Sequence, residues 1–394
     1  MAFTSGPVSF QRFLIDGPMP TDVTDKYVKA VNDHAFGRLA VLPDDTQLGW
    51  IGPHHLFETE IEGERIACGP YVHLAVRVDR LKAPPNVVKA YVQVEQQTML
   101  QAKGREFLNR SEKRQAREKA LIRADQEARA GNFRRMNSYP LLIDAKHRSV
   151  FLGTLSTTVA DKVMQLFYDT FGRGLEPADP ERLAQRALDR EKKARALESL
   201  VPFTLVTPPD PPADRDVFGE TDLRFLGKEF LTWLWFQTEA DDGPLRVSTG
   251  DEVTVLLDKT LRLKCDFGLT GVDVLTADNP TSLPEAKAAL RIGKQPTRAG
   301  LILGTPQGEF RLTLDGQRLA VSGLVLPEDE TAQDEPAILE QRFELVADAA
   351  HLLDALFEMF VLRRTARSWS GDLQAMSTWA VGKNRAKLPR AASA

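Results

Sequence analysis

The sequence predicts an α+β fold built from several small modules, and three observations support this prediction. Strand-like and helix-like segments alternate along most of the chain. A length of 394 residues is sufficient for two or three domains with a substantial core. An apolar content of 42% and a charged content of 27% are ordinary for globular proteins, which excludes wholesale disorder.

The first predicted module covers residues 1–136. It begins with a strand over residues 7–15, a helix from Thr21 or Asp22 to about Phe36, and a loop-rich stretch over 38–63. Alternating apolar residues then predict a strand with two different faces. Val72, Leu74, Val76 and Val78 are expected on the apolar face, and His73, Arg77 and Asp79 on the other. Pro84-Pro85 precede a second helix.

The second predicted module covers residues 137–207. Leu141–Asp144 and Val150–Gly153 flank a polar turn and predict a hairpin, and two helices follow it. A proline-rich segment over 208–218 predicts a stiff linker. The third module, 219–368, opens with an apolar helix containing Trp233 and Trp235, continues with short strands and a helix from about Pro284 to Arg291, and closes with a long helix over about 337–362. Residues 369–394 are expected to form a basic, flexible tail.

The segment from Lys103 to Arg135 carries the most unusual charge. Eleven of its residues are Lys or Arg and five are Asp or Glu, which leaves about +6, whereas the whole chain has a net charge of −4. A basic segment on an otherwise acidic protein favours one face that binds a polyanion. Residues 112–130 are predicted to be helical, with Ser111 as N-cap and Gly131-Asn132 as the end.

Several side chains of this segment are candidate DNA contacts. Arg110, Arg114 and Arg117 share one stripe if helical geometry extends back to Arg110, and Phe133 lies beside two cations. The structural alternatives are that the charges belong to a solvated helix face and that Phe133 is a core anchor. The predicted DNA-binding residues are Lys103, Arg105, Arg110, Lys113, Arg114, Arg117, Phe133, Arg134 and Arg135.

Signals for catalysis are weak, so no catalytic residue, metal ligand or cofactor is predicted. His54-His55 with Glu58 and Glu60 could hold a metal, but adjacent histidines do not point the same way on a strand or helix. The segment 292–297 lacks the second glycine and the Ser or Thr of a phosphate-binding loop. Asp144 and Asp266 end predicted strands, as nuclease metal ligands often do, without a supporting motif.

Two distant cysteines indicate a reducing compartment without a disulfide framework. The sequence has neither an apolar run of about 20 residues nor the hydrophobic core of a signal peptide, and we therefore expect a cytoplasmic protein without membrane partners.

Several segments together resemble RdgC, a family of bacterial recombination-associated proteins. Leu48-Gly-Trp-Ile-Gly-Pro53 is similar to the Gly-Trp-Val-Pro-Pro loop of that family. The basic helix, Phe133 and the strand ending at Ile143-Asp144 follow the family's order. Gly293-Lys294 and Gln341-Arg342-Phe343 before an Ala- and Leu-rich helix also match.

The resemblance implies a curved, three-part subunit that forms a ring-shaped homodimer around duplex DNA without sequence selection. It also implies a nucleoid-associated protein that limits the loading or activity of RecA recombinase and is not an enzyme. This chain departs from the family in the extra segments 208–218 and beyond Trp369, and it lacks a Lys-rich stretch near Leu275–Asn279. The expected DNA contact therefore rests on residues 103–135.

Two other functions remain open from the sequence. One is a metal-dependent, DNA-processing nuclease. The other is an interaction protein whose basic helix contacts an acidic partner. The preference for double-stranded or single-stranded DNA also remains open, because cations and one aromatic ring suit both.

Overall fold

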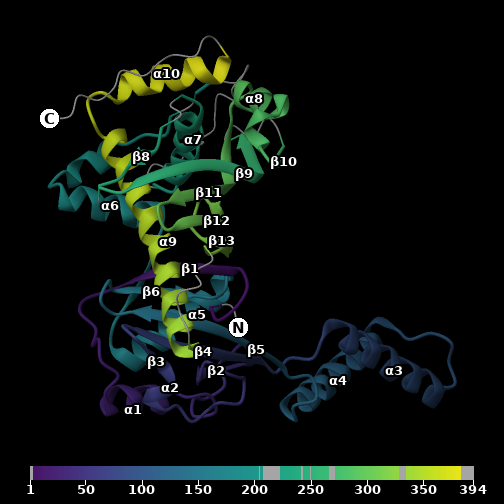
Figure 1. Cartoon of the computed structure of the whole chain (residues 1–394). Helices are drawn as coiled ribbons and strands as arrows, with labels where there is room; N and C mark the ends of the chain where they lie inside the picture. Colours follow the sequence, from purple (N-terminus) through teal and green to yellow (C-terminus); the bar gives the residue numbers. More distant parts are fainter. Residues whose placement is uncertain are drawn as a thin grey trace.

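The structure is a computed structural model that describes residues 3–203, 205–206, 222–240, 243–248, 250–265, 271–327 and 334–382. The chain forms a mixed α/β fold with a large antiparallel sheet. Figure 1 shows an elongated molecule with an N-terminal body and a C-terminal body. The helix α9 (Glu335–Arg364) runs along both bodies, and a hairpin of two helices projects sideways from the N-terminal body.

The sheet runs through both bodies. Its strand order among the described residues is β10-β9-β11-β12-β13-β1-β6-β5-β4-β2, while β3, β7 and β8 pair with β4, β1 and β9. The strands are β1 (Val8–Ile15), β2 (Thr46–Ile51), β3 (Ala67–Cys68), β4 (Tyr71–Arg80), β5 (Arg135–Asp144), β6 (Ser149–Leu152), β7 (Leu175–Pro177), β8 (Leu245–Arg246), β9 (Glu252–Cys265), β10 (Asp273–Ala277), β11 (Lys294–Thr305), β12 (Gly308–Asp315) and β13 (Val321–Val325).

Strand β1 joins the two bodies. Its first half pairs with β13, with Val8 opposite Leu324, and its second half pairs with β6, with Phe13 opposite Val150. The first strand of the chain is therefore shared between the C-terminal and the N-terminal parts of the sheet. It provides a hydrogen-bonded partner strand to each part.

Helices cover the sheet in both bodies. The α-helices are α1 (Asp25–Asp33), α2 (Gly63–Ile66), α3 (Pro85–Lys103), α4 (Arg110–Arg129), α5 (Thr157–Phe171), α6 (Pro180–Arg190), α7 (Phe225–Ala240), α8 (Pro284–Arg291), α9 and α10 (Trp369–Val381). Short 3₁₀ segments lie at Ala194–Ser199 and Pro280–Ser282. None of the described helices combines the length and apolar character needed to cross a membrane.

The apolar core has two parts: one lies in the N-terminal body, and the other fills the C-terminal body and extends onto β1, β4, β5 and β6. Strand β4 shows how they meet. Val72, Leu74 and Val76 belong to the N-terminal core, but the opposite face of the strand is buried as well. His73 packs against Phe343 of α9, with 4.9 Å between ring centroids. The polar face of this strand is therefore buried as well, and at His73 a helix from more than 250 positions later covers it.

Some of the domain boundaries expected from sequence differ from the structure. A division between residues 136 and 137 falls inside β5, and β5 pairs with β4 along its length, so both expected modules contribute to one sheet. Within the expected flexible tail, α10 occupies Trp369–Val381, so that part of the expectation is wrong, and residues 383–394 lie outside the described residues. Most of the proline-rich linker, residues 207–221, also lies outside them.

Three of the predicted helices are present in the structure. The helices at Phe225–Ala240, Pro284–Arg291 and Glu335–Arg364 confirm the predictions. The expected loop over 38–63 contains β2, which places Trp50 in the core with its Nε1 donating to Thr170 Oγ1 at 2.8 Å. Gly49 permits this strand, because a Cβ there would lie 2.5 Å from the backbone of Phe36.

Candidate nucleic-acid interface

The basic segment forms most of a helical hairpin that leaves the body between β4 and β5. Helix α3 starts after Pro84, where Pro85 occupies the first turn, and ends at Gly104 in the left-handed conformation. Helix α4 returns to β5. Because β4 and β5 pair from Tyr71–Asp144 to Arg80–Arg135, the sheet fixes the base of the hairpin. Figure 1 shows both helices extending away from the rest of the molecule.

The start of α4 differs from the prediction. Asn109, and not Ser111, is the N-cap. Its side chain accepts from the backbone N–H of Glu112, and the Glu112 side chain accepts from the backbone N–H of Asn109, both at 2.8 Å. This reciprocal capping box places Arg110 in the first turn of α4. Helical geometry therefore does extend back to Arg110, as the shared basic stripe requires.

Small side chains hold the two helices together. Ala116, Ala120, Ala124 and Ala128 are buried at every fourth position of α4, which lets α3 approach closely. No residue of α3 is fully buried. Beside this seam, the Tyr91 hydroxyl donates to Glu127, and the Arg123 guanidinium lies 4.3 Å from the Tyr91 ring centroid. The hairpin is therefore a thin element in which most side chains face solvent.

The predicted basic stripe exists on α4. Arg110, Lys113, Arg114 and Arg117 occupy i, i+3, i+4 and i+7 positions, and all four are exposed. Arg114 pairs with Glu118 at 3.1 Å across one turn. The other three have no ion pair with any residue in the described ranges. Their charge is thus available to a ligand.

Half of the eight predicted cations are paired with carboxylates. Lys103 lies 2.6 Å and Arg105 lies 3.8 Å from Glu112 Oε1, and the hydrogen bond from Lys103 is the main reason that the pKa of Glu112 is lowered. The Glu112 side chain is largely buried, whereas both cations are exposed, so a phosphate can contact these cations from the solvent side. The charges of the hairpin are only partly neutralised by the protein itself.

Phe133 and Arg134 lie at the base of the hairpin. Phe133 is half-buried in the turn after α4 and belongs to neither core cluster, so the structure does not make it a core anchor. Arg134 Nε lies 3.7 Å from Oδ2 of Asp79, a buried carboxylate that also accepts two hydrogen bonds from Arg77. Arg134 is therefore drawn toward the body, whereas Arg135 is exposed.

One cationic position at the base was not predicted from sequence. Arg80 lies directly opposite Arg135 in the β4–β5 ladder, and both are exposed without an ion pair among the described residues. They line a cleft of about 530 Å³ together with Lys162. Like charges placed opposite each other on a sheet repel, so this arrangement favours an anionic ligand between them. Only the strand register places these two arginines opposite each other, and the register cannot be predicted before the pairing of β4 with β5 is known.

The weaker sequence candidates have structural partners. His54 contacts Glu58 at 3.2 Å through Nδ1, and Glu58 also pairs with Arg65, so this group stabilises a loop. Lys294, in the segment that was compared with a phosphate loop, is buried in β11 and pairs with Asp273 at 2.7 Å. Asp144 accepts hydrogen bonds from His147 in the β5–β6 turn, and Asp266 lies outside the described residues.

No family model matches this chain, and no curated protein matches it.

Proposed function

We propose that this chain is a sequence-independent DNA-binding protein of the RdgC kind, and that the helical hairpin carries its main DNA contact. The observation that carries the proposal is the α4 stripe of exposed cations, of which Arg110, Lys113 and Arg117 have no carboxylate partner among the described residues. At the base of the hairpin, Arg80 and Arg135 extend the same charge onto the sheet.

The dimensions of the hairpin suit a double helix. Helices of 19 and 20 residues extend about 30 Å at 1.5 Å per residue. Duplex DNA carries one charge per about 1.7 Å of its axis, so a stripe two turns long meets several phosphates at once. Contacts to phosphates position a protein on DNA without reading its sequence. The proposal therefore concerns affinity and not base recognition.

Replacing Arg110, Lys113, Arg114 and Arg117 by Gln tests the proposal. Each cation that neutralises a phosphate adds about 0.9 to the slope of log K against log salt concentration, so the fourfold variant should have a slope that is smaller by about 3 to 4. Fluorescence anisotropy with labelled duplexes of unrelated sequence, at several salt concentrations, measures this slope. Far-ultraviolet circular dichroism and thermal unfolding establish that the variant is folded.

The matched control removes four exposed cations from the C-terminal body instead: Arg246, Arg262, Lys264 and Arg311, each to Gln. Both variants have the same net charge. If the hairpin is the contact, only the hairpin variant loses affinity and slope. Equal losses in both variants would mean that net charge alone drives binding, and no loss in the hairpin variant would contradict the proposal.

We also propose a homodimer that encloses DNA, as the resemblance implies. Phe107, at the end of the hairpin, is 82% exposed, so its ring is accessible to another protein surface. Sedimentation of the wild type and of Phe107→Ser tests self-association. A linear duplex with blocked ends should retain an enclosing ring through a salt wash better than a duplex with open ends, whereas equal retention would argue for surface binding.

Antagonism of RecA and the absence of nuclease activity belong to the same proposal. The protein should lower the rate of RecA-dependent strand exchange in proportion to its occupancy of duplex DNA, and the fourfold hairpin variant should not. Incubation of labelled duplex with Mg²⁺ or Mn²⁺ should leave the DNA intact. Metal-dependent cleavage by the wild-type chain would favour the nuclease alternative instead, provided that a variant of the chain purified in the same way does not cleave.

A further inference from the structure

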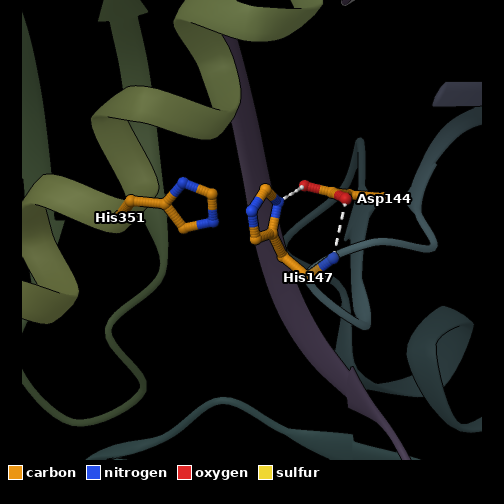
Figure 2. Close-up of side chains that lie close together, drawn as sticks. All are labelled: Asp144, His147 and His351. Atoms are coloured by element: carbon orange, nitrogen blue, oxygen red, sulfur yellow. Dashed lines mark hydrogen bonds and ion pairs between the residues drawn. The ribbon is translucent and has the colours of Figure 1, made fainter. Parts of the chain in front are cut away.

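A second group of functional side chains lies away from the hairpin, where the β5–β6 turn meets α9. Asp144, His147 and His351 each place a potential ligand atom within 4.8 Å of the others. Figure 2 shows the imidazole of His147 between the carboxylate of Asp144 and the imidazole of His351. Two elements that are far apart in the sequence thus bring two imidazoles face to edge, with 4.6 Å between ring centroids.

Asp144 fixes the orientation of His147. Its Oδ1 accepts from the backbone N–H of His147 at 3.0 Å, and its Oδ2 lies 2.7 Å from Nδ1 of the same residue. The carboxylate is almost completely buried, whereas the imidazole is 45% exposed. A hydrogen bond at Nδ1 leaves the lone pair on Nε2, on the side away from Asp144. Histidines that bind metals in proteins are commonly held by a carboxylate in this way.

The helix supplies the facing groups. His351 is half-buried on α9, and Asp348 lies one turn earlier on the same helix. Both line the same pocket beside β11 and β12. Asp348 has no hydrogen bond or ion pair among the described residues, but its carboxylate is not one of the ligand atoms that lie within 4.8 Å of one another.

The remaining charges of this region are already engaged. Asp354, one turn beyond His351, forms an ion pair with Arg12, and Glu358 pairs with Arg190 at 2.9 Å. These cations are directed to those carboxylates, so they do not neutralise Asp348. The alternative role for the two imidazoles is a simple aromatic contact that fixes α9 on the turn. That role does not need the buried carboxylate that holds His147.

We propose that His147 and His351 bind a divalent transition-metal ion of the Zn²⁺ class, with Asp144 as the positioning residue and water completing the coordination. Imidazole nitrogens are common ligands for such ions, at metal–nitrogen distances of about 2.0–2.1 Å. The ion would clamp the β5–β6 turn of the N-terminal body to α9. This site is separate from the DNA-binding proposal and does not depend on it.

Isothermal titration of the tag-free, full-length chain with ZnCl₂, after dialysis against a chelator, tests the site. We expect one Zn²⁺ per chain and a higher melting temperature in its presence, because the ion binds only where both elements are folded together. Titration with Co²⁺ provides a second readout, since visible absorption without thiolate charge-transfer bands distinguishes this ligand set from Cys68 or Cys265.

Four variants locate the ion. His147→Gln and His351→Gln should each abolish the stoichiometric site, and Asp144→Asn should weaken it about 10- to 100-fold because the orienting carboxylate is lost. His55→Gln, an exposed histidine on a different loop, is the matched control and should bind as the wild type does.

The melting temperature of each variant without metal shows whether it is folded. Absence of Zn²⁺ binding by the wild type overturns the proposal, as does unchanged binding by folded His147→Gln and His351→Gln. If a variant does not fold, the Co²⁺ spectrum of the wild type still decides, because a spectrum with thiolate bands places the ion elsewhere.

Discussion

The projecting hairpin and the α9 interface, meaning the contacts of α9 with β1, β4 and α7, use charge in opposite ways. On α4 of the hairpin, the cations are exposed, and their carboxylate partners lie one turn away or are missing among the described residues. At the α9 interface, Arg364 donates through Nε to Glu229 at 2.8 Å, and both are buried. Arg12 likewise reaches Asp354 from β1 with two hydrogen bonds.

This difference distinguishes charged residues that are available to bind a ligand from charged residues that stabilise the fold. A buried ion that loses its partner is costly, so the α9 pairs are tied to the fold. An exposed ion pair stabilises little and is easily exchanged for a phosphate. Counting Lys and Arg along the sequence cannot make this distinction, because both kinds of residue have the same formal charge. Substitutions in the two regions should therefore differ in size and in what they affect.

The largest effect is expected for Arg364→Met. Arg364 also donates to the carbonyl of Val201 and lies over Trp369, while Glu229 accepts from the backbone N–H of Phe203. Removal of the guanidinium leaves a buried carboxylate unpaired and should lower the free energy of unfolding by about 3–5 kcal/mol, measured by urea denaturation. The double variant with Glu229→Gln should recover part of this loss. A loss below about 1 kcal/mol would contradict the claim that this buried ion pair is tied to the fold.

An intermediate, pH-dependent effect is expected for His73. Burial against Phe343, and to a smaller degree His54, lowers the pKa of His73 to about 4, whereas an unfolded histidine titrates near 6.5. Between these values the unfolded state binds more protons, so stability that is present above pH 6.5 is lost as the pH falls toward 4. The loss between about pH 7.5 and pH 5 should be about 2 kcal/mol.

The variant His73→Phe, which places an apolar ring against Phe343, should remove this part of the pH dependence. Urea denaturation at the two pH values measures it, and His55→Phe, at an exposed position, is the matched control. A slope that is the same in His73→Phe as in the wild type would show that other groups cause the acid sensitivity.

The smallest effect on stability is expected for Arg114→Ala, although it lies in the proposed DNA contact. Its pair with Glu118 is exposed on both sides, so its loss should change the free energy of unfolding by no more than about 0.5 kcal/mol. The same variant should lower the salt slope of DNA binding by about 1. A large loss of stability here would show that the hairpin charges are structural, as at the α9 interface.

The sequence by itself determined much of the local structure. The helix of Pro284–Arg291 was predicted with the bounds it has, because Pro at the first turn and the apolar spacing are local signals. The turn between β5 and β6 and the helix containing Trp233 and Trp235 were predicted for the same reason. The charge of the hairpin also follows from composition alone.

Contacts between distant elements could be determined only from the tertiary structure. The burial of both faces of β4 depends on α9, and the opposition of Arg80 and Arg135 depends on the β4–β5 register. The approach of His351 to His147 requires both bodies to be assembled, because the two residues lie on elements far apart in the chain. Local sequence determines backbone preference and charge, whereas partners are selected only when distant elements pack and exclude water.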